Sequence, residues 1–184
     1  MDQKQVEIRA YGQSDAEQVQ SVCLETAGAG LRRFKKFLLG SFCDYYIEAE
    51  PGNCFVATDV QDRAVGYILC SEDTKIWKKI FDENYVKRLP PIFRLAARGS
   101  GAEAMKFADE YPAHLHIDIL PEYQHSGVGT GLMEVLIEHL RQKSVAGVQL
   151  TVAKSNVNAR AFYQKCGFAI LADRPTVVVM GVKL

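Results

Sequence analysis

The chain has 184 residues, a length that suits one domain with a substantial hydrophobic core. Its 22 Lys and Arg residues are balanced by 22 Asp and Glu residues, so the formal net charge is zero. A general electrostatic attraction to nucleic acid or to an anionic bilayer is therefore not indicated. With 48% apolar and 10% aromatic residues, global disorder and a fibrous architecture are excluded. We predict a single globular domain, residues 1–184, whose function depends on a local motif.

The cysteines and the N-terminal residues indicate the compartment and the absence of a metal. The five cysteines lie far apart, with no CxxC pair or Cys/His cluster, so we predict neither a disulfide framework nor a metal site. Residues 1–5 are polar and lead into no apolar run long enough for a signal peptide or a membrane span. We therefore expect a cytoplasmic protein without a membrane partner.

The N-terminal residues predict a strand followed by a helix. From Val6 to Ala10 apolar and polar residues alternate, which is typical of a half-buried strand. Ser14 and Glu17 have the spacing of a capping box, and the apolar periodicity behind them predicts a first helix that runs to Thr26.

Further helix and a hairpin follow. Gly28 and Gly30 end the first helix, and residues 31–47 predict a less regular helical segment whose large apolar residues face inward. Residues 54–60 and 63–70 are apolar runs separated by Gln61 and Asp62, which predicts a β-hairpin. The inward residues are expected to be Phe34, Phe37, Leu38 and Phe42.

Residues 71–112 have a different character, because short helical patterns are interrupted by Pro90-Pro91 and by the glycines at 99 and 101. We interpret them as a helical insertion between the third and fourth strands, placed over a cleft or against a partner chain, so a homodimer stays open. The remaining predicted elements are a strand at 114–120, a helix at 128–141, a strand at 147–152, a helix at 157–165 and strands at 168–172 and 176–183. This order predicts an α/β fold with a mixed sheet flanked by helices.

One segment carries chemistry: Gln124-His125-Ser126-Gly127-Val128-Gly129-Thr130-Gly131, between a predicted strand and a predicted helix. Its glycines allow successive amides to point into one concavity at a helix N-terminus, which is a phosphate-binding arrangement. A tight strand-to-helix turn without a ligand is the alternative. A P-loop is excluded because no Lys follows Gly129, and a dinucleotide fingerprint is excluded because Leu132 replaces its third glycine.

Two spaced blocks resemble the GNAT superfamily of N-acetyltransferases. Gln124-x-x-Gly127-x-Gly129 is similar to the pyrophosphate-binding motif of that family, Gln/Arg-x-x-Gly-x-Gly/Ala. Further along, the block Asn156-x-x-Ala159-x-x-Phe162-Tyr163-x-x-x-Gly167-Phe168 resembles a second family pattern, with a predicted strand between the two. The resemblance covers residues 112–172 closely and implies a mostly antiparallel central sheet.

The resemblance implies acetyl-CoA as co-substrate and no metal. Backbone amides of the glycine loop would hold the pyrophosphate, and the pantetheine arm would run along the end of the 114–120 strand. This strand separates from the 147–152 strand in the family, so that a backbone N–H near Ile119 can polarise the thioester carbonyl. The residues implied for cofactor binding are Ile119, Leu120, Gln124, His125, Ser126, Gly127, Val128, Gly129, Thr130, Asn156 and Tyr163. A plain helix N-cap is the alternative for Asn156, and one residue can serve both roles.

For catalysis the resemblance implies that Tyr163 is the general acid that protonates the leaving thiolate. A tyrosine packed beside Phe162 is the structural alternative. An amine nucleophile must lose a proton, and His114, His116 and Asp118 alternate on one strand and so share a face. His116 is the preferred base because its unperturbed pKa is near 6.5, and a water relay is the alternative.

The resemblance thus implies direct acetyl transfer, within a ternary complex, to a primary amine of a small molecule or a protein. The rival readings are an acyl-CoA-binding pseudo-acetyltransferase without turnover and an interaction domain whose insertion contacts a partner. The run His114 to Pro121 also resembles the acetyltransferase-like domains related to the C-terminal part of O-GlcNAcases. The acceptor is expected to contact the insertion and the 31–47 region, including Tyr45 and Tyr46.

Overall fold

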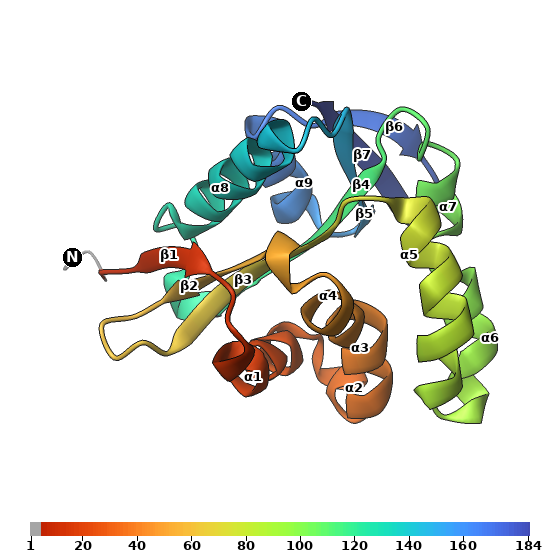
Figure 1. Ribbon diagram of the computed structural model, residues 1–184, viewed down its shortest axis with the longest axis horizontal. Helices are drawn as coiled ribbons and strands as arrows, with labels where there is room; N and C mark the ends of the chain where they lie inside the picture. The colour runs from red at the N-terminus through yellow and green to blue at the C-terminus, as the bar shows by residue number, and fades with distance from the viewer. Residues whose placement is uncertain (1–4) are drawn as a thin grey trace.

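The computed structural model describes residues 5–184, in which seven strands form one sheet (Figure 1). Its strand order is β1-β2-β3-β4-β5-β7-β6, and every neighbouring pair is antiparallel except β4 and β5, which are parallel. The strands are β1 Glu7–Ala10, β2 Cys54–Thr58, β3 Ala64–Ser71, β4 Ala113–Ile119, β5 Gly147–Ala153, β6 Ala169–Asp173 and β7 Val177–Lys183. The predicted mixed, mostly antiparallel α/β fold is confirmed.

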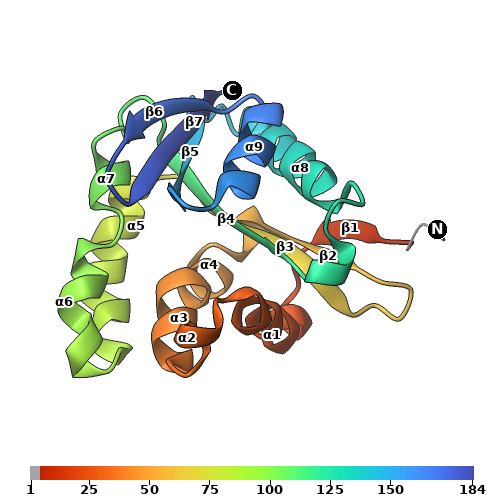
Figure 2. The ribbon, with the colours of Figure 1, turned by 180° about the vertical axis from the view of Figure 1, so that it is seen from behind.

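Helices cover both faces of this sheet (Figures 1 and 2). The α-helices are α1 Ala16–Thr26, α2 Ala29–Arg32, α3 Lys35–Phe42, α4 Asp44–Ala49, α5 Thr74–Ile80, α6 Pro91–Gly99, α7 Ala102–Met105, α8 Val128–Gln142 and α9 Val157–Lys165. One face carries α1 to α4, and the opposite face carries α8 and α9. Among residues 5–184, no helix combines the length and the apolar character that crossing a membrane requires.

The period-two alternation of the central strands divides the core between the two faces. In β3, Tyr67 and Leu69 pack with residues of α1, α3 and α4, whereas Ile68 and Cys70 pack with residues of α8. All four side chains are fully buried, as expected for a strand covered by helices on both sides. The same alternation in β4 decides which of its residues face the candidate site.

The insertion forms α5, α6 and α7, with a π turn at residues 81–85 and a 3₁₀ turn at 86–88 after α5. Aromatic rings of the insertion contact α4, since Trp77 and Tyr85 both lie against Tyr45. Its far end is tied to the sheet by Gln149, whose amide donates to the carbonyl oxygens of Ala104 (3.0 Å) and Tyr111 (2.7 Å). The predicted placement between the third and fourth strands is confirmed.

Two local expectations were wrong. Ser14 does not cap α1, because a 3₁₀ turn at residues 13–15 precedes the helix and the Asp15 carboxylate accepts the Gly12 N–H and the Arg9 guanidinium instead. Phe42 is not buried, with 36% of its surface exposed. Tyr45 and Tyr46 are buried in the core by α4, and Tyr45 also lines a surface recess near Glu72; their contact with the acceptor stays a prediction.

Candidate active site

Strands β4 and β5 separate soon after they pair. They are joined at Ala113–Val148 and His114–Gln149, and the ladder continues no further. On its other edge, β4 stays paired with β3 from His114 to Ile119. Figure 2 shows the two strands diverging, with α9 following the end of β5. The second half of β4 therefore has one edge without a strand partner.

Backbone groups of β4 point to this open edge. The Leu120 N–H donates to the Val65 carbonyl oxygen at 2.9 Å, in register with the β3–β4 ladder. Antiparallel pairing alternates along a strand, so the N–H and C=O groups of Ile117 and Ile119 are directed away from β3. A chain laid along this edge would meet the N–H groups of Ile117 and Ile119 and the carbonyl group of Ile117, whereas the Ile119 carbonyl oxygen already accepts the Gln124 amide.

The glycine loop opens at the N-terminus of α8, close to this edge. Gly127 is the helix N-cap in the left-handed region, with φ +90°, and a Cβ there would meet no atom within 4 Å. The first intrahelical bond runs from the Gly131 N–H to the Gly127 carbonyl, so the N–H groups of the first turn before it lack helix partners. Their donors and the positive end of a 15-residue helix form an anion-binding terminus.

Gly129 has a different role from Gly127. A Cβ at Gly129 would lie 3.1 Å from Cδ1 of Ile119 and 3.2 Å from Cζ of Phe162, which is closer than side chains pack without moving. The glycine therefore lets α8 approach both the end of β4 and α9. Gly127 thus allows the turn of the loop, and Gly129 allows the close packing of α8 against β4 and α9.

The other predicted loop residues hold the loop or are exposed. The Gln124 amide donates to the Ile119 carbonyl oxygen at 2.9 Å, and the Ser126 hydroxyl donates to the Tyr123 carbonyl oxygen at 2.5 Å. His125 is exposed with φ +59°. Val128 is buried under the first turn and Thr130 is exposed. Leu120 is half-buried between the two cores, at the end of β4.

Helix α9 supplies the next two predicted residues. Asn156 is the N-cap, because its Oδ1 accepts the Ala159 N–H at 3.1 Å, and the residue is exposed. Tyr163 is buried between the rings of Phe162 and Phe168, with centroids at 5.3 and 5.9 Å. Burial, and then the nearby charge of Asp118, raise the pKa of its phenol above the ordinary value of 10. At neutral pH it therefore keeps its proton.

His114 has a partner for each ring nitrogen. The Thr74 hydroxyl donates to the Pro112 carbonyl oxygen at 2.7 Å, so the Nδ1–H of His114 donates to Thr74 at 2.9 Å. The Nε2 atom then accepts the Tyr46 hydroxyl proton at 2.9 Å. Burial, and then His116, lower the pKa of His114 to about 3, so the ring is neutral. Its hydrogen-bonding capacity is used within the core.

Asp118 lies on the part of β4 that has left β5. Its Oδ2 accepts the hydroxyl proton of Tyr67 at 2.5 Å, and Tyr67 stands directly opposite on β3. Burial raises the pKa of the carboxyl group to about 6, although the Tyr67 hydrogen bond acts in the other direction. Thr26 lies beside the group as well, but its hydroxyl donates to the Val22 carbonyl oxygen at 2.8 Å. Tyr67 is therefore the donor that holds the carboxylate.

His116, between these two residues, is half-buried and packs against rings. Its imidazole lies edge-on to Phe42, with centroids 5.5 Å apart, and to Tyr46 at 5.2 Å. Burial lowers its pKa to about 4, so this imidazole is also neutral at pH 7. His116 and Asp118 share the β4 face that looks toward α1 and α3. Because its pKa is higher, Asp118 is the stronger base of the two.

The comparisons with known proteins agree with this geometry. The model of the acetyltransferase (GNAT) family matches residues 29–168, which is more than half of the chain. The chain belongs to the acetyltransferase (GNAT) family. In this GNAT protein the matched range contains the glycine loop, β4 and α9, which together make the candidate site.

Curated relatives are similar in part or over most of the chain. A ribosomal protein bS18-alanine N-acetyltransferase of Escherichia coli (strain K12) is 42% identical over 53 residues, which are 29% of this chain and 36% of that relative. The match thus spans about a third of the relative's length. An uncharacterized N-acetyltransferase of Archaeoglobus fulgidus is 24% identical over 161 residues, covering 86% of this chain and 89% of the relative.

Solved structures resemble the whole GNAT domain. The crystal structure of SsHAT has a TM-score of 0.86 and 31% identity, covering 97% of this chain and 98% of that chain. A PaiA N-acetyltransferase from Thermoplasma acidophilum, in complex with coenzyme A, has a TM-score of 0.64 and 15% identity, with 98% and 99% covered. At that identity the second likeness concerns the fold alone.

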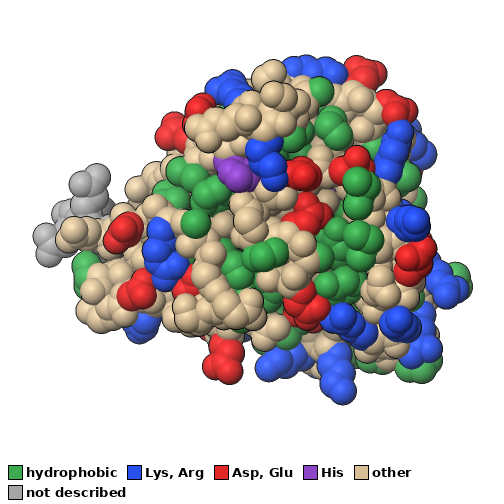
Figure 3. Space-filling view, viewed as in Figure 1, with side chains coloured by type: hydrophobic (Ala, Val, Ile, Leu, Met, Phe, Trp, Pro, Cys, Tyr) green, Lys and Arg blue, Asp and Glu red, His purple; other side chains and the backbone are tan. Residues whose placement is uncertain are grey.

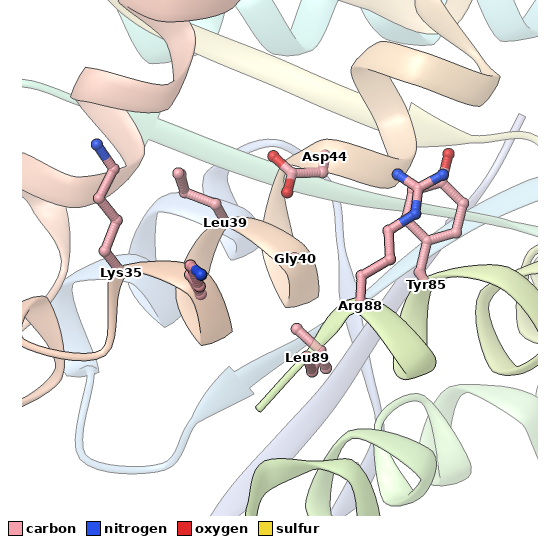
Figure 4. Close-up of a pocket in the computed structure, with 8 residues that line it drawn as sticks. Lys35, Leu39, Gly40, Asp44, Tyr85, Arg88 and Leu89 are labelled. Atoms are coloured by element: carbon pink, nitrogen blue, oxygen red, sulfur yellow. The ribbon is translucent and has the colours of Figure 1, made fainter. Parts of the chain in front are cut away.

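Two surface recesses of this GNAT protein lie away from the site. One, of about 250 Å³, is enclosed by α3, α4 and the turn before α6, with Lys35, Asp44 and Arg88 at its rim (Figure 4). The other, of about 440 Å³, lies beyond the C-terminal end of β3, near Glu72 and Lys143. Neither contains a residue of the glycine loop, β4 or α9. Within residues 5–184, no group of three His, Cys, Asp or Glu residues is arranged to hold a metal ion.

Sequence reasoning missed Tyr67 and assigned Phe42 to the core. Tyr67 sits in a strand of buried residues and has no motif around it, so only the β3–β4 register reveals that it faces Asp118. Phe42 follows the apolar period of its helix, yet that helix ends there and leaves the ring beside His116. Both residues depend on pairings between distant segments, which local patterns do not specify.

Proposed function

We propose that this chain is an acetyl-CoA-dependent N-acetyltransferase that moves the acetyl group directly to a primary amine in a ternary complex. The observation that carries the proposal is the placement of Asp118 and Tyr163. One lies on β4 and the other on α9, close enough for the carboxylate charge to act on the phenol, beside the edge that β5 has left. Membership of the GNAT family supports acetyl-CoA as the acetyl donor.

The glycine loop is proposed to hold the anionic end of acetyl-CoA. The N–H donors of Gly127 to Thr130 and the N-terminal end of α8 suit a pyrophosphate. The pantetheine arm would lie along the open edge of β4 and reach the N–H of Ile119. Asn156 has its Oδ1 engaged in the cap and can offer its amide N–H groups to the same arm.

The transfer step can be written with all atoms accounted for. The nitrogen lone pair of the amine attacks the thioester carbonyl carbon, and the Ile119 N–H stabilises the oxyanion that forms. The C–N bond replaces the C–S bond. Asp118 receives a proton from the amine, and Tyr163 gives its proton to the departing thiolate. The products are the N-acetyl amine and free CoA.

Asp118 replaces His116 as the preferred base. Its carboxylate is aligned by Tyr67, and its raised pKa makes it a better proton acceptor than an ordinary aspartate at neutral pH. His114 is set aside because both of its nitrogens are used in the core. His116 is assigned to the wall of the acceptor site.

The test combines binding and turnover. Acetyl-CoA is titrated by calorimetry, and release of the CoA thiol is then followed with a panel of amines for the native protein and Tyr163→Phe. We expect binding, amine-dependent thiol release and a slower chemical step in Tyr163→Phe. No binding would contradict the proposal, and binding without turnover on the whole panel would favour the acyl-CoA-binding pseudo-acetyltransferase.

Two finer expectations stay predictions: the cytoplasmic location and the likeness to the acetyltransferase-like domains related to O-GlcNAcases.

A further inference from the structure

A row of rings leads away from the proposed base. The His116 ring contacts Phe42 with centroids 5.5 Å apart, and Phe42 contacts Phe37 at 6.4 Å. Phe37 stacks on Phe93 of α6 at 4.7 Å, and Phe93 meets Phe34 edge-on at 5.0 Å. We call these five side chains the aromatic row. It starts two residues from Asp118 on the same face of β4.

The aromatic row is left partly open to solvent. Phe42 exposes 36% of its surface, and Phe34, Phe37 and Phe93 are half-buried, whereas Tyr46 on the neighbouring helix is fully buried. Burial of phenylalanine rings is favourable, so a contiguous row of rings left half-open on a surface indicates a binding site. The row offers an apolar body a place to bind beside the carboxylate.

The charges around the aromatic row favour an acceptor with a single amino group. Asp118 attracts one ammonium group, and neutral His116 does not repel it. Residues 27–44 carry Arg32, Arg33, Lys35 and Lys36 and one acidic residue, Asp44, so this segment has a net positive charge. Figure 3 shows Lys and Arg side chains gathered at the lower right of the molecule, over α2, α3 and α6. A second ammonium group placed along the row would meet these cations.

Distances along β4 set the length of the acceptor. Residues two apart on a strand are about 6.6 Å from each other, so Asp118 lies one such step from His116. The Phe42 ring lies beside the His116 imidazole, with the two ring centroids 5.5 Å apart. An amino group near Asp118 and a ring against Phe42 are therefore joined by a short alkyl linker.

We propose that the acceptor is a primary monoamine whose amino group is connected by a short alkyl linker to an aromatic body that packs on Phe42. This inference rests on the proposed function and adds the substrate class. The amino group reacts at Asp118 by the transfer step given above, and the aromatic body takes no part in bond changes. Specificity comes from burying the ring.

The test measures kcat/KM by CoA thiol release for an acceptor panel. The panel contains 2-phenylethylamine, butylamine, putrescine, spermidine, glucosamine and a tripeptide with a free N-terminus. Each acceptor is used with the native protein, Phe42→Ala, Phe42→Leu and Leu95→Ala. Leu95 is the matched control, because its side chain on α6 is 82% exposed and outside the aromatic row.

The expected result is selective. 2-Phenylethylamine has the highest kcat/KM, and Phe42→Ala lowers it about 10-fold, mainly by raising KM, since one aromatic pair accounts for a factor of about 2–10 beyond the loss of buried area. Butylamine is affected much less, Phe42→Leu is intermediate, and Leu95→Ala equals the native protein.

Three results would overturn the inference. They are a highest kcat/KM with spermidine or the tripeptide, an equal loss for butylamine and 2-phenylethylamine in Phe42→Ala, and an equal loss in Leu95→Ala. If another amine is acetylated and Asp118→Asn abolishes that turnover, the proposed function stands and only the substrate class is wrong. If no amine releases CoA, both proposals fail.

Discussion

At the scale of single residues, three polar side chains that alternate along β4 have three different environments. His114 has both nitrogens hydrogen-bonded in the core, His116 lies among rings, and Asp118 holds a hydroxyl proton donor on one oxygen. They share a strand face, but their different neighbours give them different hydrogen bonds and different pKa values. Each environment leads to a separate prediction.

Replacement of the base is predicted to remove an ionisation from the activity profile. Because burial raises the pKa of Asp118 to about 6, kcat/KM of the native protein should fall on the acid side with an inflection near pH 6. Asp118→Asn should lose about 10²–10⁴-fold in kcat and lose that inflection. The measurement is a pH profile of thiol release. An unchanged acid limb in Asp118→Asn would assign the ionisation to another group.

Tyr67 is predicted to be a positioning residue. Its hydrogen bond favours the ionised carboxylate, so Tyr67→Phe should move the acid inflection to higher pH and lower kcat moderately. Tyr11→Phe is the control, because Tyr11 is also buried in the same core and its hydroxyl has no hydrogen-bond partner among residues 5–184. A shift of the same size in both variants would indicate a general packing effect.

His114 is predicted to contribute to stability and not to catalysis. In His114→Phe the buried hydroxyl of Tyr46 loses its acceptor, which should lower the free energy of unfolding by about 1–3 kcal/mol. Thiol release per folded molecule should change little. Urea unfolding and kinetics on the same samples check this. Loss of turnover at native stability would instead make His114 part of the catalytic machinery.

The stability of the protein should decrease in mild acid. Burial lowers the pKa of His114 to about 3 and of His116 to about 4, so between about pH 6.5 and 4 the unfolded chain binds an additional proton at each. Asp118, with a pKa of about 6, binds one more proton in the folded chain and opposes this. The two histidines outweigh one carboxyl group, so the free energy of unfolding falls as the pH is lowered. Urea midpoints should show this, with a shallower slope in His116→Asn; an identical slope would exclude His116 as a source.

At the scale of elements, the site depends on how closely α8 approaches β4 and α9. Gly129→Ala should push against Ile119 and Phe162, the neighbours of Asp118 and Tyr163. We expect a raised KM for acetyl-CoA and a lower melting temperature. Gly52→Ala is the control, because a Cβ there meets no atom within 4 Å and its φ is not positive. Native acetyl-CoA affinity in Gly129→Ala would contradict this role of the contact.

Most elements could be predicted from the sequence because their signals are local. The glycine loop, the apolar period of α8 and the second motif gave α8 and α9 nearly to the residue. What failed depends on distant segments. The Tyr67–Asp118 hydrogen bond follows from strand register, and the two partners of His114 come from α4 and α5. Phe42 stands at the end of α3, and its ring meets His116 of β4. No pattern within one segment specifies such contacts between distant segments.

At the scale of the whole molecule, the residues proposed to bind the acetyl donor and those proposed to bind the amine lie on opposite faces of the sheet. Helices α8 and α9 lie on one face with the glycine loop, Asn156 and Tyr163, whereas Asp118, His116 and the aromatic row look toward α1, α3 and α6 on the other. Between the two faces, β4 separates from β5 after His114. In the proposed function, the acetyl group meets the amine at this gap, with the acetyl donor arriving from one face and the amine from the other.

The most direct test of this arrangement is residue-resolved amide hydrogen exchange with and without acetyl-CoA. The account predicts that acetyl-CoA slows exchange at Ile117 and Ile119 on the open edge of β4 and at the first-turn amides of α8, with no change around the Lys35–Arg88 recess. Protection confined to that recess, or no protection anywhere, would contradict a donor site between the separated strands.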